Sequence, residues 1–262
     1  ERFCLDDGVH FKMNKFSEKS HFLIQTEDHQ YTMVLPAWKA GNVQGWLAEQ
    51  AMAYDLSMLQ AMASMLGERD LVLDIGANIG NHTVYLAAVV GCQVVAFEPN
   101  PELCAPLRES ISLNGLDERV TLVSNDVSVK LANGVFAELT PVHLGVQSLS
   151  LLSGGNSANV DTMEVVSLDT MSFDQPVKVI KINVEGMELG VLAGAQSLIE
   201  RDKPALFVEA QIEEQFDQLN EWLQERGYTY RDTFNATPTH WFIHKDELGE
   251  KVIIDHSFEK EH

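Results

Sequence analysis

Residues 71–80 of the chain read Leu-Val-Leu-Asp-Ile-Gly-Ala-Asn-Ile-Gly. The first five residues form a short apolar run of strand character, and glycines stand at positions 76 and 80. A helical pattern then covers residues 79–90 and ends at Gly91. A strand that passes through a glycine turn into a helix is the repeating unit of a parallel α/β sheet. Ligands of such sheets bind beyond the carboxyl ends of the strands, where this turn lies.

The rest of the chain continues this alternation of strands and helices. Further strands are expected at residues 93–97, 120–123, 177–182, 205–209, 228–231 and 240–244, and further helices at residues 49–66, 101–113, 188–200 and 213–226. The pattern predicts an α/β fold with a mostly parallel seven-stranded sheet and helices on both faces. No helix separates the last two strands, so they should add an antiparallel edge strand. Residues 125–168 break the pattern, and we expect an inserted hairpin or a mobile loop there.

The length of 262 residues fits one large α/β domain, which we expect at residues 46–246. Two strand-like runs between Phe22 and Leu35 predict a hairpin, so residues 1–45 should form a small N-terminal β annex. Residues 247–262 are interpreted as a C-terminal tail. The oligomeric state is left open by the sequence, with a dimer as one option.

The composition restricts the partners and the compartment. With 18 basic and 39 acidic side chains, the formal net charge is −21, which repels phosphate backbones, so no nucleic-acid partner is expected unless a local basic groove exists. The three cysteines are too few for a disulfide framework or a metal cluster. No apolar run reaches the roughly 20 residues of a membrane helix, and no signal peptide is visible. We therefore expect a cytoplasmic protein without a membrane span.

The turn itself indicates the class of ligand. Gly76 allows a tight turn, Gly80 lets the helix start close to a ligand, and Asp74 offers a carboxylate to an ammonium group. A dinucleotide fingerprint would read G-x-G-x-x-G, but position 78 is Asn and the spacing is D-x-G-x-x-x-G. S-adenosyl-L-methionine has an amino-acid head and no phosphate, so it matches this turn better. A tight glycine turn that binds nothing is the alternative.

Acidic and amide residues after the next two strands extend the candidate cofactor site. Glu98 ends the second strand, about 20 residues beyond the turn, where a carboxylate can accept both hydroxyls of a ribose. Asn125 and Asp126 follow the third strand, where an Asp can meet the exocyclic amine of adenine. A solvated turn explains the Asn-Asp pair equally well, because these residues favour turns for local reasons.

Together with further segments, these residues resemble the FkbM family of methyltransferases. The matching segments are residues 73–80, 96–99, 113–115, 179–186 and 188–194, with residues 235–240 similar to a tail segment of some members. The resemblance implies a class I methyltransferase (Rossmann-like) fold. It also implies S-adenosyl-L-methionine as cofactor, S-adenosylhomocysteine as product, and transfer of the methyl group to an oxygen. The implied acceptors are hydroxyls of sugars, glycolipids or small secondary metabolites.

The chain departs from the family pattern at one position. The family usually has Asp in a Lys-Ile-Asp-Val-Glu-Gly motif, where this chain has Asn183. Asn keeps the size and an acceptor oxygen but loses the charge, which weakens the case for a divalent metal, since hard cations prefer charged oxygen ligands. A divalent metal is therefore left open, and Asn183 is assigned to the cofactor site. The substitution also raises the alternative of a catalytically silent S-adenosylmethionine-binding module.

The same motif supplies the candidate catalytic residues. Lys181, Asn183 and Glu185 alternate along the end of the fourth strand and should share one face. We hypothesise that Glu185 orients or deprotonates the acceptor hydroxyl, that a cationic cofactor favours its ionised form, and that His240 is the rival base. A structural ion pair between Lys181 and Glu185 and an ordinary strand histidine at position 240 are the alternatives.

The function expected from these observations is O-methylation of a small-molecule or glycan hydroxyl. An RNA methyltransferase is a weaker alternative because of the net charge, and a nicotinamide-dependent enzyme is disfavoured because its fingerprint is absent. The candidate segments for the acceptor pocket are residues 148–159, the N-terminal hairpin and residues 234–241. In the last of these, Phe234 and Trp241 could stack on a sugar or fill the core. The expected helix at residues 49–66 should cover the cleft or simply pack on the sheet.

Overall fold

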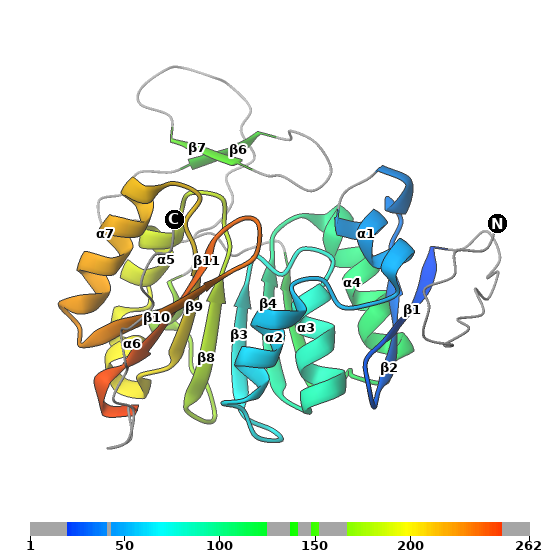
Figure 1. Ribbon diagram of the computed structural model, residues 1–262, viewed down its shortest axis with the longest axis horizontal. Coiled ribbons are helices and arrows are strands. Elements are labelled where there is room, and N and C mark those ends of the chain that lie inside the picture. The colour runs from blue at the N-terminus through cyan, green and yellow to red at the C-terminus, as the bar shows by residue number, and fades with distance from the viewer. Residues whose placement is uncertain (1–19, 41–42, 125–136, 141–147, 152–166, 248–262) are drawn as a thin grey trace, which may run out of the picture.

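A seven-stranded sheet forms the centre of the protein (Figure 1). The computed structural model describes residues 20–40, 43–124, 137–140, 148–151 and 167–247. The strand order is β10-β11-β9-β8-β3-β4-β5. The strands are β3 (Leu71–Ile75), β4 (Gln93–Glu98), β5 (Val120–Ser124), β8 (Val177–Ile182), β9 (Ala205–Glu209), β10 (Tyr228–Phe234) and β11 (Thr239–His244). The central strand β3 pairs in parallel with both β4 and β8, which confirms the predicted mostly parallel sheet.

The last two strands give one end of the sheet its antiparallel pairing. Strand β11 runs antiparallel to β9 and to β10, so it lies between them and β10 is the outermost strand. The predicted antiparallel pairing at this edge of the sheet is confirmed, and the structure gives the order of the two strands.

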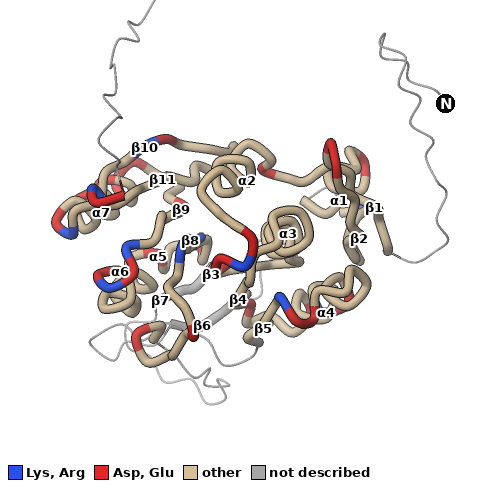
Figure 2. The backbone as a smooth tube through the Cα atoms, turned by 90° about the horizontal axis from the view of Figure 1, so that it is seen from below, with Lys and Arg blue, Asp and Glu red and all other residues tan. Residues whose placement is uncertain are grey.

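Helices cover both faces of the sheet (Figure 2). One face carries α2 (Leu56–Ala63), α3 (Asn81–Tyr85), the π-helical turn η2 (Leu86–Val90) and α4 (Pro101–Leu113). The other face carries α5 (Glu188–Ala193), α6 (Gln196–Asp202) and α7 (Glu213–Gln224). Successive residues of a strand point to opposite faces of the sheet and so belong to two separate hydrophobic cores. On β3, for example, Val72 belongs to one core and Leu73 to the other. The prediction of helices on both faces is confirmed.

Two segments that were each predicted as one continuous helix are interrupted in the structure. The helix expected at residues 49–66 is two helices, α1 (Val43–Gln50) and α2, because Ala51 and Asp55 have the left-handed φ angles 53° and 59°. A left-handed residue cannot continue the hydrogen-bond ladder of a right-handed helix. The helix expected at residues 188–200 likewise divides into α5 and α6 around Gly194.

The N-terminal hairpin is confirmed as a separate two-stranded sheet of β1 (His21–Gln25) and β2 (Gln30–Val34). Its fully buried residues include Ile24 and Met33, which belong to the same core as α3 and α4. The Thr32 backbone and the Asn114 side chain exchange two hydrogen bonds of 2.8 and 2.7 Å, so the hairpin is fastened to the end of α4.

The segment between β5 and β8 is described only in part. It contains β6 (Ala137–Thr140) and β7 (Ser148–Leu151), which pair antiparallel, in agreement with an inserted hairpin. The glycine-rich residues 153–157 and Cys4 lie outside the described residues. No helix within the described ranges is long and apolar enough to cross a membrane.

Candidate functional site

The turn between β3 and α3 is built around three left-handed residues. Gly76, Asn78 and Gly80 have φ angles of 78°, 54° and 87°. A Cβ atom on Gly76 would lie 1.8 Å from the Asn183 carbonyl oxygen, and one on Gly80 would lie 2.1 Å from a methyl carbon of Leu107. Both glycines therefore let the turn pack against the end of β8 and against α4, a role that the sequence pattern did not indicate.

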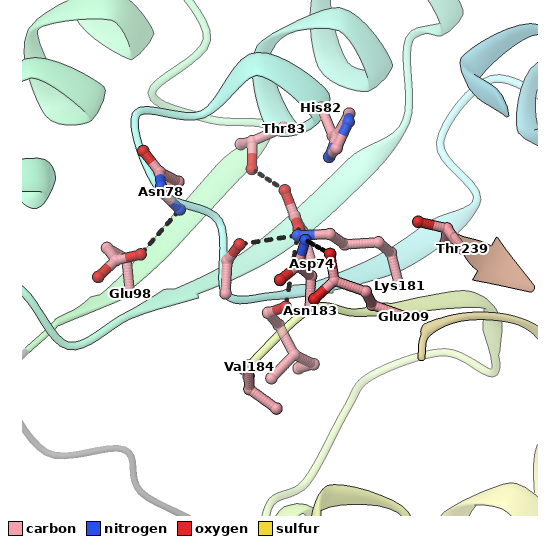
Figure 3. Close-up of polar contacts among 12 residues, drawn as sticks. Asp74, Asn78, His82, Thr83, Glu98, Lys181, Asn183, Val184, Glu209 and Thr239 are labelled. Carbon is pink, nitrogen blue, oxygen red and sulfur yellow. Dashed lines mark hydrogen bonds and ion pairs between the residues drawn. The ribbon is translucent and has the colours of Figure 1, made fainter. Parts of the chain in front are cut away.

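Asp74 and Lys181 form a buried ion pair beneath the turn (Figure 3). Asp74 Oδ1 lies 2.9 Å from Lys181 Nζ, and Oδ2 accepts a hydrogen bond of 2.6 Å from Thr83. Lys181 also donates to the Gly76 carbonyl at 2.7 Å. Burial acts to raise the pKa of Asp74, but the lysine ammonium holds that pKa below its usual range.

This arrangement changes the interpretation of both residues. The ammonium group that meets Asp74 is that of Lys181, and Asp74 has an exposed fraction of 0%. The ion pair of Lys181 is therefore made with Asp74 rather than with Glu185. Through the Asp74 carboxylate and the Gly76 carbonyl, Lys181 joins the end of β3 to the turn.

Glu98 joins the end of β4 to the same turn. Its carboxylate accepts backbone N–H bonds from Asn78 at 2.8 Å and from Asn100 at 2.9 Å. Burial raises the pKa of Glu98, and the two backbone donors act against that rise. Glu98 thus stands beside the turn, as the sequence predicted, and also fixes the backbone of Asn78.

Every backbone amide of residues 76–80 is hydrogen-bonded within the protein. The amides of residues 76 and 77 donate to the Phe97 carbonyl, and the Asn78 amide donates to Glu98. The amides of residues 79 and 80 donate to the Asn78 side chain and to the Ala77 carbonyl. A pyrophosphate requires free N–H groups at such a turn. The amides of residues 76–80 are therefore not free to bind a phosphate.

A second polar group lies where β8 and β9 end. Asn183 Nδ2 donates to Glu209 Oε1 at 3.1 Å, and Gln211 Nε2 lies 2.9 Å from Glu185 Oε2 and 3.4 Å from Glu209 Oε2. Burial, together with the neighbouring Glu185 carboxylate, raises the pKa of Glu209 to about 7. Neither Glu209 nor Gln211 was predicted from the sequence, although Glu209 ends an apolar strand as Glu98 does.

Glu185 does not continue the alternation of β8. The strand ends at Ile182, and Glu185 has a left-handed φ of 52° in the following turn. Strand geometry therefore does not place it beside Lys181, and its carboxylate accepts a hydrogen bond from the Gln211 amide. Burial raises the pKa of Glu185, and the Gln211 amide acts against that rise.

His240 lies on the other face of the sheet from Lys181. Its ring nitrogens contact Thr233 Oγ1 at 2.8 Å and the Ala210 carbonyl at 3.4 Å, and its ring centroid lies 4.5 Å from that of Phe216 in α7. Burial lowers the pKa of His240, which favours a neutral imidazole. The structure thus gives His240 a packing role and does not bring it to the Asp74–Lys181 pair.

The remaining candidates divide between core and undescribed residues. Trp241 stacks on Phe207 with ring centroids 5.7 Å apart, next to Phe234, so the two predicted aromatic platforms pack on the core. Asn125 and Asp126, the candidate adenine contacts, lie outside the described residues. Among the residues that the structure describes, no group of three or more His, Cys, Asp or Glu could hold a metal ion.

The strand order, the antiparallel strand β11 and the turn at the end of the central strand define a class I methyltransferase-like α/β fold. The family model "Methyltransferase FkbM domain" matches residues 74–230. The chain therefore belongs to the FkbM methyltransferase family, as the sequence motifs indicated.

Solved structures resemble this chain at low sequence identity. The FkbM methyltransferase from Methylobacillus flagellatus KT aligns with a TM-score of 0.51 and 19% identity, over 68% of this chain and 44% of that one. This chain thus spans less than half the length of that relative. M. jannaschii TYW2 in complex with AdoMet aligns with a TM-score of 0.44 and 14% identity, over 87% and 86% of the two chains. No curated protein sequence matches the chain.

Proposed function

We propose that the protein is an S-adenosylmethionine-dependent O-methyltransferase that acts on a hydroxyl of a sugar, a glycolipid or a small secondary metabolite. The observation that carries the proposal is the fixed unit of Glu98 and the β3–α3 turn, in a chain of the FkbM family. In this proposal Glu98 accepts the ribose hydroxyls, and the turn with Asn78 faces the amino-acid head of the cofactor. In this proposal Asn183, Asn125 and Asp126 also contact the cofactor, and the last two lie outside the described residues.

The charges around the site fit this cofactor. Glu98 ends β4, Glu185 follows β8 and Glu188 begins α5, whereas the Asp74 carboxylate is paired with the Lys181 ammonium. S-adenosylmethionine carries a sulfonium and a net positive charge, and an acidic site attracts such a cation. A nicotinamide dinucleotide would bring two negative phosphates to the same place and would find no free amide in residues 76–80.

The residues of the site have separate parts in the proposed reaction. When bound, the cofactor supplies an electrophilic methyl group for an in-line displacement, in which positioning contributes much of the rate. Glu185 is half-buried and held by Gln211, so it can orient the acceptor hydroxyl. Lys181 acts through Asp74 and the Gly76 carbonyl and so is a positioning residue. His240 stays the rival base, although its side chain packs on the opposite face.

The test combines binding and turnover. The full chain should bind S-adenosylmethionine in calorimetry and should form S-adenosylhomocysteine with at least one member of a panel of sugars, glycolipids and phenolic metabolites. Binding without turnover on any acceptor would favour the silent binding module, in which Asn183 marks a lost reaction. Salt-dependent binding of RNA, together with methylation of RNA, would contradict the proposed acceptor class.

A further inference from the structure

We propose that Glu209 is the catalytic residue that removes the proton from the acceptor hydroxyl, and that the amides of Asn183 and Gln211 hold its carboxylate in place for this step. This inference rests on the proposed function and adds a residue and a role to it.

The geometry around Glu209 is that of a fixed carboxylate. It is the last residue of β9 and is 4% exposed. One carboxylate oxygen accepts from the Asn183 amide at 3.1 Å and the other lies 3.4 Å from the Gln211 amide. Two donors from different segments restrict the carboxylate to one orientation, at the same edge of the sheet as Glu98.

The groups that face Glu209 suit a proton acceptor. Lys181 on β8, Glu185 in the turn after β8 and Glu188 on α5 are the charged neighbours, and β11 contributes the uncharged Thr239 opposite Glu209. Burial and the two nearby carboxylates raise the pKa to about 7, while Lys181 and the Gln211 amide act against the rise. A general base is most effective when its pKa lies near the working pH.

The proposed step balances in protons and electrons. The proton of the acceptor hydroxyl passes to a Glu209 oxygen while the hydroxyl oxygen forms its bond to the methyl carbon. The bond between that carbon and sulfur breaks, and its electron pair stays on sulfur. No further oxidant, reductant or metal is required for this balance.

Asn183 acquires a specific role from this arrangement. Its amide nitrogen donates to Glu209. An aspartate of the same shape would replace this donor with a second carboxylate oxygen about 3 Å away, which would raise the pKa of Glu209 further and weaken its orientation. Asn183 is therefore a positioning residue that keeps Glu209 usable as a base near neutral pH, and its uncharged side chain is compatible with activity.

The first test measures the carboxyl group directly, without a substrate. Carbon-13 NMR of the full chain labelled at glutamate carboxyl carbons should show one resonance that titrates near pH 7 and is lost in Glu209→Gln. Glu185→Gln should lower the midpoint by removing a neighbouring charge, and Asn183→Asp should raise it. The exposed Glu221→Gln on α7 should leave it unchanged. A Glu209 resonance that titrates near 4.5 would overturn the proposal.

The second test measures turnover with an acceptor found in the panel. Glu209→Gln should lower kcat by on the order of 10²–10⁴ while calorimetry shows unchanged cofactor affinity and the thermal unfolding curve stays cooperative. Asn183→Asp should move the acid limb of the pH–rate profile upward. An unchanged kcat in Glu209→Gln would refute the proposed role of Glu209 and leave the proposed function standing. Failure of the unmodified chain to bind the cofactor would refute the proposed function itself.

Discussion

The buried pair of Asp74 and Lys181 predicts a large and pH-dependent loss of stability in Lys181→Met. The side chains are 0% and 4% exposed, so the substitution leaves a carboxylate without its counter-charge inside the protein. Removing one partner of such a pair costs about 3–5 kcal/mol. For a chain of this size, about 1 kcal/mol lowers Tm by about 2–4 °C, so Tm should fall by about 6–20 °C.

The pH dependence follows from the shift of the Asp74 pKa. In the unmodified chain this pKa is lowered, so the stabilisation is present above the unfolded-state pKa and is lost as the pH falls through the folded-state value. In Lys181→Met, burial without the lysine raises the pKa of Asp74, so the free energy of unfolding should fall most at pH 8 and least at pH 5. A loss that does not change with pH would refute this reasoning.

Urea unfolding at both pH values measures this difference. The double variant Asp74→Asn with Lys181→Met removes the buried charge and should recover part of the stability at pH 8. Thr83 can still bond to the introduced amide, so the hydrogen bond at this position need not be lost. A loss below about 1 kcal/mol in Lys181→Met would show that Asp74 is not buried as a charged group.

Three further predictions concern the turn and the carboxylates. Glu98→Gln should weaken S-adenosylmethionine binding about 10–100-fold in calorimetry, since a hydrogen bond to a charged group contributes about 1.5–3 kcal/mol, and unchanged affinity would contradict its role. Gly76→Ala should unfold at a lower urea concentration than Gly115→Ala. Both glycines have a positive φ, but only at position 76 would the added Cβ atom clash, 1.8 Å from the Asn183 carbonyl oxygen. Equal losses of stability in the two variants would contradict this packing. The pKa of Glu209 is raised from 4.5 to about 7, so its stabilising effect is complete below pH 4.5 and is lost as the pH rises to about 7. Glu209→Gln should thus be more stable than the unmodified chain at pH 8, by up to about 3 kcal/mol, and an equal difference at pH 4 and pH 8 would argue against the shift.

The sequence predicted the elements whose signals are local. Strand β9 and helix α4 have the predicted bounds, because the strand is a short apolar run and the helix begins at Pro101 after the capping residue Asn100. The break between α1 and α2 was not predictable in this way. The Asn81 side chain bonds both the amide and the carbonyl of Tyr54, 27 residues away, and this contact exists only in the folded chain.

In the candidate site, too, features with a local sequence signal were predicted and features that depend on tertiary contacts were not. Glu98 and the glycine turn could be identified because Glu98 ends one strand and the turn directly follows another. The partners of Lys181 and Asn183 could not be assigned, because they depend on β8 lying between β3 and β9. A sequence shows which polar residues end a strand but not which strand ends are neighbours, so the contact between Asn183 and Glu209 became visible only in the structure.

Isothermal titration calorimetry of the full chain with S-adenosylmethionine tests most directly whether the β3–α3 turn and Glu98 form a cofactor site. We predict saturable binding at one site, weaker binding in Glu98→Gln, and no measurable binding of NAD, because the amides of residues 76–80 are already bonded within the protein. Binding of NAD in preference to S-adenosylmethionine, or no binding of S-adenosylmethionine by the folded chain, would contradict the proposed site.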